Sequence, residues 1–191
     1  MITLDFNRAA ASNKPFPHAL LPIAIPRDAS NAALSWLVSE APWDLRVEDF
    51  YVQHEFSLLN VALGDAIAPL ASGAFIDQVR EFLERTFSLD RTLHLVDVNA
   101  HRLTSKQVIR VHNDYIEGAE THRFLIQLNT GWTAAQGGLL MLFEEDNVET
   151  VRQVLLPQHG SGFAFEISPR SFHAVSEIRH GERYTLVYTF S

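Results

Sequence analysis

Two histidines and one aspartate in the second half of the chain form a candidate metal-binding set. His112 and Asp114 make an H-x-D pair in VIRVHNDYIEG, and positions i and i+2 of a β-strand face the same side. Chance alone gives roughly half an H-x-D pair per chain of this composition, so the pair decides nothing by itself. His173, in ISPRSFHAVSEI, adds an imidazole that a rolled sheet can bring alongside. This donor set on one face of an octahedral iron leaves three positions open, which closed tetrahedral zinc would not.

A second pair of residues near the C-terminus suggests what those open positions would hold. Arg183 and Thr185 in GERYTLVYTF stand at i and i+2 of a predicted strand, so their side chains share a face. A guanidinium beside a hydroxyl can grip one end of a dicarboxylate through charge-assisted hydrogen bonds. The alternative is that Arg183 forms a structural ion pair with Glu177 or Glu182, and the sequence alone leaves both interpretations open.

The composition restricts the classes of protein that can carry this set. The chain has 191 residues, 47% hydrophobic and 20% charged, which suits one globular domain. The formal net charge of -8 argues against a general nucleic-acid-binding protein, and the absence of cysteine excludes disulfides, thiolate metal sites and cysteine nucleophiles. The N-terminal segment shows neither a signal-peptide pattern nor a long apolar run, so we expect a cytoplasmic protein with no membrane partner.

The first half of the chain, about residues 1–92, is predicted to be mainly helical. Asp28 and Ser30 each suit a helix N-cap, and apolar residues follow at helical spacing until Pro42 ends the run. A second helix is predicted over about 73–87, where an apolar stripe recurs with the period of an amphipathic helix. These helices must then pack on whatever the second half forms.

From about residue 93 the pattern changes to short runs rich in β-branched and aromatic residues. The segments that fit strands are LHLVDVNAH, RFLIQLNT, GLLMLFEE, VRQVLLP, SGFAFEI and RYTLVYTF. About six to nine strands in this length predict a double-stranded β-helix, or jelly roll, over about 93–191. We therefore expect an α+β, mainly β fold in one domain over 1–191, with the N-terminal helices packed outside.

The order and spacing of these motifs resemble the iron(II)- and 2-oxoglutarate-dependent oxygenases, in particular their prolyl-4-hydroxylase-like branch. The matching stretches run from PFPHALLPIAIP near the start through HND at 112–114, RFLIQLN at 123–129 and GGLLMLF at 137–143 to SPRSFHAVSEIRHGERYTLVYTF at 168–190. The resemblance covers most of the chain and is strongest over 111–190. It implies Fe(II), the co-substrate 2-oxoglutarate and O2.

The resemblance also implies roles for individual residues. His112, Asp114 and His173 match the facial metal ligands, which are the catalytic centre of the family. Arg183 matches the residue that pairs with the C5 carboxylate of 2-oxoglutarate, and Thr185 matches a hydroxyl that assists it.

Three further positions qualify this assignment. Gln127 stands where relatives often carry a tyrosine that touches the co-substrate, so we expect Gln127 among the cofactor-binding residues. Asp114 is retained, whereas halogenating relatives have a small residue there, which favours hydroxylation or another hydrogen-abstraction reaction such as desaturation or ring closure. Thr189 occupies the place of a second arginine in the nucleic-acid demethylases, which agrees with the acidic charge in arguing against nucleic acid.

The segment Tyr115–His122 directly follows the candidate ligands and contains two glutamates. It is either a lid that closes the site and favours a cationic or amide-rich substrate, or a solvated acidic loop. Other polar positions are either pocket residues or structural residues. The residues whose roles stay open are Glu117, Glu120, His122, Asn99, His101 and Arg110.

Two classes of function remain. The resemblance favours an oxygenase that hydroxylates an amino-acid side chain in a peptide, including a ribosomally made, modified peptide, and the alternative enzyme acts on a free amino acid or small metabolite. From another class, a non-catalytic jelly roll would bind metal structurally. Arg183 and Thr185 argue against that class, because a structural metal needs no grip for a dicarboxylate. The sequence gives no indication of the oligomeric state.

Overall fold

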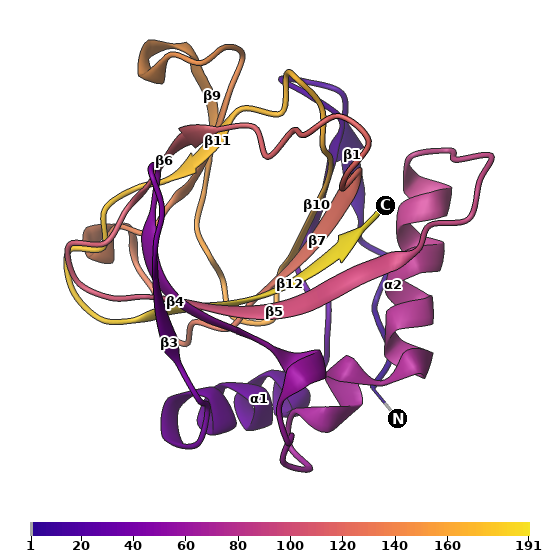
Figure 1. Cartoon of the computed structure of the whole chain (residues 1–191), viewed down its shortest axis with the longest axis vertical. Coiled ribbons are helices and arrows are strands. Elements are labelled where there is room, and N and C mark those ends of the chain that lie inside the picture. Colours follow the sequence, from indigo (N-terminus) through magenta and orange to yellow (C-terminus); the bar gives the residue numbers. More distant parts are fainter. Residues whose placement is uncertain (1) are drawn as a thin grey trace.

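The computed structural model describes residues 2–191, which form two antiparallel sheets and two α-helices (Figure 1). The strands of the larger sheet are β1 (Ala10–Ser12), β2 (His18–Leu21), β3 (Asp44–Val47), β4 (Val52–Ser57), β5 (Leu95–Leu103), β7 (His122–Gln127), β10 (Gly162–Glu166) and β12 (Arg183–Phe190). The strands of the smaller sheet are β6 (Ile109–His112), β8 (Leu140–Phe143), β9 (Val151–Leu155) and β11 (His173–Val175). The helices are α1 (Arg27–Ser39) and α2 (Gly73–Thr86), and single 3-10 turns lie at Leu58–Asn60, Ala68–Ala71, Ala134–Gln136 and Val148–Thr150.

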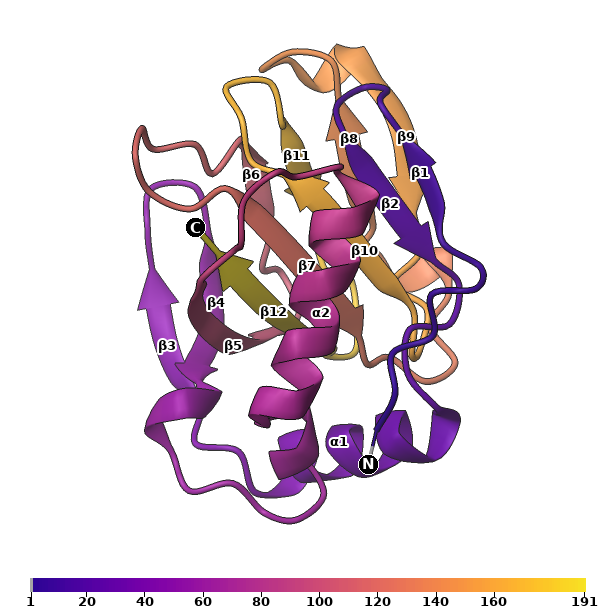
Figure 2. The ribbon, with the colours of Figure 1, turned by 90° about the vertical axis from the view of Figure 1, so that its right-hand side faces the viewer.

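The two sheets face each other, and both helices lie on the outer side of the larger one (Figure 1). The larger sheet has the strand order β1-β2-β10-β7-β12-β5-β4-β3, and the smaller sheet has the order β6-β11-β8-β9. Figure 2 shows α2 lying across β7 and β12. The arrangement is the double-stranded β-helix with helices packed outside that the sequence predicts.

Helix α2 forms where the sequence analysis places it, and its packing explains why. The Ser72 hydroxyl caps the helix by accepting the Phe75 N–H at 3.3 Å. The rings of Phe75 and Phe82 then contact Tyr188 and Phe124 of the sheet, with centroids 5.8 and 5.7 Å apart. Each buried aromatic side chain contributes about 1.5–3 kcal/mol to stability. Within residues 2–191, no helix is long and apolar enough to cross a membrane.

The expected start of α1 is wrong by a few residues. The helix begins at Arg27, directly after Pro26, so Asp28 and Ser30 lie inside its first turn instead of capping it. The Ser30 hydroxyl instead donates back to the Pro26 carbonyl at 3.1 Å. The helix ends at Ser39, before Pro42, as the proline predicts.

The first half of the chain is less helical than predicted, because β1 to β4 all lie within it. The strands β1 and β3 are edge strands, and every residue in each is exposed, so neither shows the alternation of buried and exposed residues that would identify it. In the second half, each of the six predicted segments contains a strand, and β6 and β11 complete the smaller sheet.

Candidate metal centre and co-substrate pocket

His112, Asp114 and His173 converge at one end of the smaller sheet. The strands β6 and β11 pair with His112 directly opposite His173, and this pairing sets the two imidazoles side by side. The His112 Nε2 atom lies 3.4 Å from Asp114 Oδ1, and the His173 Nε2 atom lies 3.2 Å from Asp114 Oδ2. One ligand atom from each residue lies within 4.8 Å of the others, which suits a single metal ion.

Asp114 reaches this position by a route that the sequence analysis did not foresee. Strand β6 ends at His112, so the expected strand geometry of H-x-D, with both side chains on one face, is wrong. Asp114 has a φ of 60°, in the left-handed region that aspartate tolerates better than most residues, and the backbone turns there. The turn is anchored by Ser171, whose hydroxyl donates to the Asn113 carbonyl at 2.8 Å.

Backbone carbonyls set the orientation of both imidazoles. The His112 Nδ1 atom lies 2.8 Å from the Arg110 carbonyl oxygen, and the His173 Nδ1 atom lies 2.7 Å from the Ser171 carbonyl oxygen. A carbonyl only accepts, so each Nδ1 must carry the proton. Each Nε2 therefore presents a lone pair toward Asp114, the arrangement typical of metal-binding histidines.

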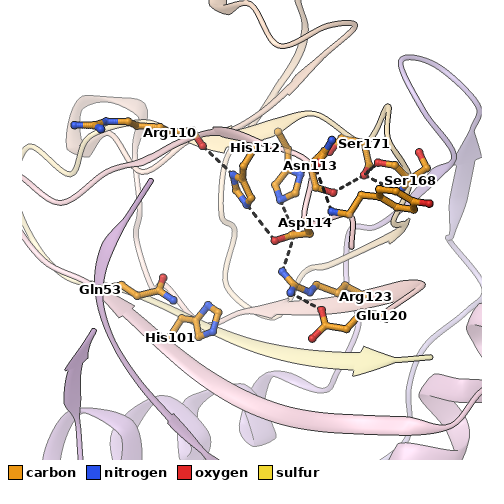
Figure 3. A network of polar contacts seen from close by, with 12 residues as sticks. Gln53, His101, Arg110, His112, Asn113, Asp114, Glu120, Arg123, Ser168 and Ser171 are labelled. Atoms are coloured by element: carbon orange, nitrogen blue, oxygen red, sulfur yellow. Dashed lines mark hydrogen bonds and ion pairs between the residues drawn. The ribbon is translucent and has the colours of Figure 1, made fainter. Parts of the chain in front are cut away.

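The charges around Asp114 keep it an anion although it is buried. Burial opposes its ionisation, but the nearby Arg123 guanidinium holds the pKa of Asp114 well below its ordinary value. Arg123 Nη1 donates to Asp114 Oδ2 at 2.6 Å, and Arg123 Nη2 donates to Glu120 Oε2 at 2.6 Å (Figure 3). Burial and the neighbouring His112 lower the pKa of His173. The site thus offers one carboxylate and two imidazole Nε2 atoms to a metal.

A cavity of about 240 Å³ connects these three residues with the larger sheet. Glu55, His101 and Thr185 stand directly opposite one another on β4, β5 and β12, so their side chains share the inner face of that sheet. The residues that line the cavity are Phe50, Tyr51, Gln53, Glu55, Asn99, His101, Ile109, His112, Asp114, Arg123, Leu125, Leu140, Phe165, His173, Val175, Arg183, Thr185 and Val187.

Arg183 lines this cavity as a buried cation that has no anionic partner within the described residues. Its side chain is 4% exposed, and its Nε and Nη2 atoms have no hydrogen-bond partner within residues 2–191. Burial lowers the pKa of Arg183 only to about 10, so the guanidinium stays charged at neutral pH. Glu182, a partner that the sequence left open, instead accepts a hydrogen bond from the Tyr184 hydroxyl. A buried, unpaired guanidinium beside a metal-binding set fits a ligand with a carboxylate at its far end.

The other predicted pocket residues divide between the cavity and its surroundings. Thr185 lines the cavity and donates its hydroxyl hydrogen to Gln127 Oε1 at 3.0 Å, whereas Gln127 itself is not part of the lining. Asn99 and His101 also line the cavity. Arg110 does not, and Figure 3 shows its side chain pointing away from the candidate ligands.

His122 and Trp132 do not line the cavity and pack against other parts of the chain. His122 is 3% exposed, and its ring lies 5.2 Å from the ring of Phe87, outside the cavity. Trp132 lies in the loop after β7 and donates its indole N–H to the Gly137 carbonyl of the same loop at 2.9 Å.

The β3–β4 hairpin contributes cavity residues that the sequence analysis missed. Phe50 stacks on His112 with ring centroids 4.6 Å apart, and the Arg110 N–H donates to the Phe50 carbonyl at 2.9 Å, which joins the hairpin to β6. Gln53 and Glu55 point into the cavity from β4. The available signal was the alternation of Val52, His54 and Phe56 with these polar residues, but the run is short and lies beside an exposed edge strand.

A family model described as the 2OG-Fe(II) oxygenase superfamily matches residues 98–190, the stretch that carries all three candidate ligands and Arg183. The match covers just under half of the chain, and over these residues the chain is similar to this superfamily. The similarity implies Fe(II), 2-oxoglutarate and O2, and the donor set and the unpaired Arg183 fit the metal and the dicarboxylate.

The curated relatives are longer proteins. Prolyl 3-hydroxylase sudestada1 of Drosophila melanogaster is 24% identical over 179 residues, which cover 89% of this chain and 33% of the relative. Prolyl 3-hydroxylase OGFOD1 of Xenopus laevis is 26% identical over 179 residues, covering 91% of this chain and 34% of the relative. The chain thus spans about one third of the length of the curated relatives it matches.

Solved structures share the fold at lower identity. A Pseudomonas putida prolyl-4-hydroxylase superposes with a TM-score of 0.73 at 17% identity, covering 91% of each chain. The viral collagen prolyl hydroxylase of Paramecium Bursaria Chlorella virus-1, solved with 2-oxoglutarate, gives a TM-score of 0.68 at 12% identity, covering 91% of this chain and 94% of that one. These likenesses establish that the chain shares the double-stranded β-helix fold of these proteins.

Proposed function

We propose that this chain is a 2-oxoglutarate-dependent dioxygenase that hydroxylates an amino-acid side chain within a peptide, and that residues 1–191 act as one oxygenase domain. Proline is the favoured target, because the curated relatives are named as prolyl 3-hydroxylases. A structural neighbour, a prolyl hydroxylase from Trichoplax adhaerens, was solved in complex with a peptide fragment of the hypoxia inducible factor oxygen degradation domain, at a TM-score of 0.70 and 12% identity.

One observation carries the proposal. The three candidate ligands and an unpaired, buried arginine line the same cavity. In this assignment His112, Asp114 and His173 hold Fe(II), and Arg183 pairs with the distal carboxylate of 2-oxoglutarate. When bound, the metal and co-substrate supply the oxidising power, and the overall reaction converts 2-oxoglutarate, O2 and R–H into succinate, CO2 and R–OH.

The chain itself positions these groups and keeps water away. Leu125, Leu140, Phe165, Val175 and Val187 form apolar parts of the cavity wall between the candidate ligands and Arg183. A dry wall strengthens the pairing of Arg183 with a carboxylate, because water no longer competes for the guanidinium. Thr185 lies next to Arg183 on the same face, and its hydroxyl hydrogen is held by Gln127 Oε1, so Gln127 fixes the rotamer of Thr185 at this end of the cavity.

The surroundings of the cavity favour a peptide over a free amino acid. A second hollow shares Phe50, His112, Asp114 and Arg123 with the cavity and continues onto the loop after β6. Ile116 on that loop is 70% exposed. A free amino acid would leave this apolar rim exposed to water, whereas a peptide that crosses the rim would cover it.

The test is an anaerobic titration of the protein with Fe(II) and then 2-oxoglutarate, followed by visible absorption. We expect a charge-transfer band that appears only with both additions and is absent in His173→Ala. A folded, iron-loaded protein without the band would favour a structural metal site. Succinate release with proline peptides, compared with free proline, then separates the peptide hydroxylase from a hydroxylase of small molecules.

Replacing Arg183 tests the co-substrate assignment separately. Arg183→Ala should weaken 2-oxoglutarate binding roughly 10- to 100-fold, because it deletes a charge-assisted pair, while Mn(II) affinity stays the same. Calorimetry on the Mn(II)-loaded protein measures both constants. Arg179→Ala, which removes an exposed arginine four residues earlier in the chain, is the matched control and should change neither. If Arg183→Ala bound 2-oxoglutarate as tightly as the wild type, the assignment of Arg183 to the co-substrate would be wrong.

A further inference from the structure

Strand β4 presents two hydrogen-bond acceptors to the cavity from the side opposite the candidate metal ligands. Gln53 and Glu55 alternate with His54 and Phe56, and only the first two line the cavity. Phe56 faces the helix side, where its ring lies 5.0 Å from the ring of Trp43. Figure 3 shows Gln53 next to His101, below the candidate ligands and separated from them by the cavity.

The contact between the two side chains fixes what each one offers. Gln53 is 3% exposed, and its Nε2 donates to Glu55 Oε2 at 2.7 Å. The amide must be oriented this way, because the opposite orientation would place its oxygen against a carboxylate. Gln53 Oε1 is therefore left as a buried acceptor with no partner within residues 2–191. A buried acceptor without a donor is unfavourable, so it marks a place where a ligand can supply one.

The Glu55 carboxylate lines the cavity, and its neighbours within residues 2–191 balance its charge only weakly. The nearest basic side chains are Arg46, whose Nε lies 3.6 Å from Oε1, and His101, whose Nε2 lies 3.9 Å from Oε2. The Arg46 side chain is 63% exposed on edge strand β3, so solvent screens its charge. His101 is neutral, because burial and then Arg123 and Arg183 lower its pKa to about 3.

The co-substrate cannot satisfy this pair. 2-Oxoglutarate is a dianion and is repelled by Glu55, and its proposed partner Arg183 lies on β12, which β5 separates from β4. Two strand spacings put the backbones of β4 and β12 about 10 Å apart. A proline side chain has no donor to offer either. The two acceptors are therefore left for another part of the substrate.

We propose that Gln53 and Glu55 bind a lysine or arginine side chain of the peptide substrate, so that β4 selects peptides with a basic residue close to the oxidised one. The proposal rests on the proposed function and names the class of peptide that the site takes. An ammonium or guanidinium supplies donors to both Gln53 Oε1 and Glu55, and its charge is balanced by the carboxylate.

The test uses acetylated, amidated tripeptides with a central proline and either lysine or norleucine at the first or third position. Norleucine matches the length of the lysine side chain without its charge. Calorimetry measures their dissociation constants on protein loaded with Mn(II) and 2-oxoglutarate. We expect at least one lysine peptide to bind roughly tenfold or more tightly than its norleucine match. Glu55→Gln should reduce that preference to about twofold or less.

The control variant is Glu48→Gln, which removes an exposed carboxylate of the same hairpin that does not line the cavity. It should keep the lysine preference, whereas a general attraction to the acidic protein would weaken equally in both variants. Equal binding of the lysine and norleucine peptides, or a preference that survives Glu55→Gln, would overturn the proposal. If the Mn(II)-loaded protein ignores 2-oxoglutarate but keeps a Glu55-dependent lysine preference, the oxygenase assignment fails and the basic-residue site stands.

Discussion

At the scale of single residues, the candidate centre depends on neighbours as much as on the ligands. The H-x-D motif identifies Asp114, but the orientation of its carboxylate follows from a left-handed backbone and from Arg123. Neither feature can be read from the motif, because a pair at i and i+2 is equally compatible with a regular strand. The partner of Arg183 could not be predicted for a similar reason. Whether this guanidinium pairs with a glutamate of the chain or with the carboxylate of a ligand depends on which acidic side chains the fold brings next to it.

Arg123 is predicted to be a positioning residue for the metal. Its guanidinium joins Asp114 to Glu120 with two bonds of 2.6 Å, so Arg123→Met should leave the Asp114 carboxylate free to rotate. Loss of such a supporting contact lowers metal affinity roughly 10- to 100-fold. Mn(II) titration followed by electron paramagnetic resonance measures the effect, and Arg123→Lys should recover part of it. Unchanged affinity in Arg123→Met would show that Asp114 is oriented without this contact.

At the scale of elements, hydrophobic patterning predicted six strands of the second half and the position of α2, because most of these elements bury at least one face. It failed for the edge strands β1 and β3, whose residues are all exposed. The β3–β4 hairpin was therefore missed, and with it the wall that carries Gln53 and Glu55. The pocket residues on β5 and β12 could be predicted only as candidates, since their convergence depends on how the strands pair.

The loop before β8 holds Arg183 in place from the side. Gly138 has a φ of 65°, and a Cβ there would lie 2.6 Å from Ile178 Cδ1 and 3.0 Å from Arg183 Cδ. Gly138→Ala should displace Arg183 and weaken 2-oxoglutarate binding roughly tenfold, with little change in Mn(II) affinity. Gly131→Ala is the matched control, because Gly131 has a φ of 67° and no neighbour within 4 Å. If the two variants bound 2-oxoglutarate with similar affinity, any effect would come from backbone strain alone, and the contact between residue 138 and Arg183 would be unimportant.

At the scale of the whole molecule, a buried histidine links folding to pH. Burial, and then the charge of Arg91, lowers the pKa of His122 from 6.5 to about 4. The unfolded chain therefore binds this proton below about pH 6.5, whereas the native protein binds it only near pH 4. The stability that neutral His122 confers is full above pH 6.5 and is lost as the pH falls toward 4, by up to about 3 kcal/mol.

His122→Phe removes this titration while keeping a ring against Phe87. The free energy of unfolding in urea, measured between pH 7 and pH 4, should fall less steeply for the variant than for the wild type. Carboxylates that titrate in the same range affect both proteins equally, so the difference between the curves isolates His122. Parallel curves would show that His122 has the same pKa in the native and unfolded states, and would contradict the prediction.

The division of the site between two sheets has a consequence for how the protein resists opening. The candidate metal ligands lie on and just after strands of the smaller sheet, and Arg183 lies on the larger one, so a metal with 2-oxoglutarate would tie the two together. The strands β6 and β11 have only four and three residues, so we expect ligand binding to stabilise the smaller sheet more than the larger one. A ligand whose free concentration is 100 times its dissociation constant stabilises the native state by about 2.7 kcal/mol. Amide hydrogen exchange in β6 and β11 should therefore slow more with Mn(II) and 2-oxoglutarate together than with Mn(II) alone. Scarcity of iron or co-substrate would then do more than stop turnover, because it would leave the chain easier to unfold locally and to cleave.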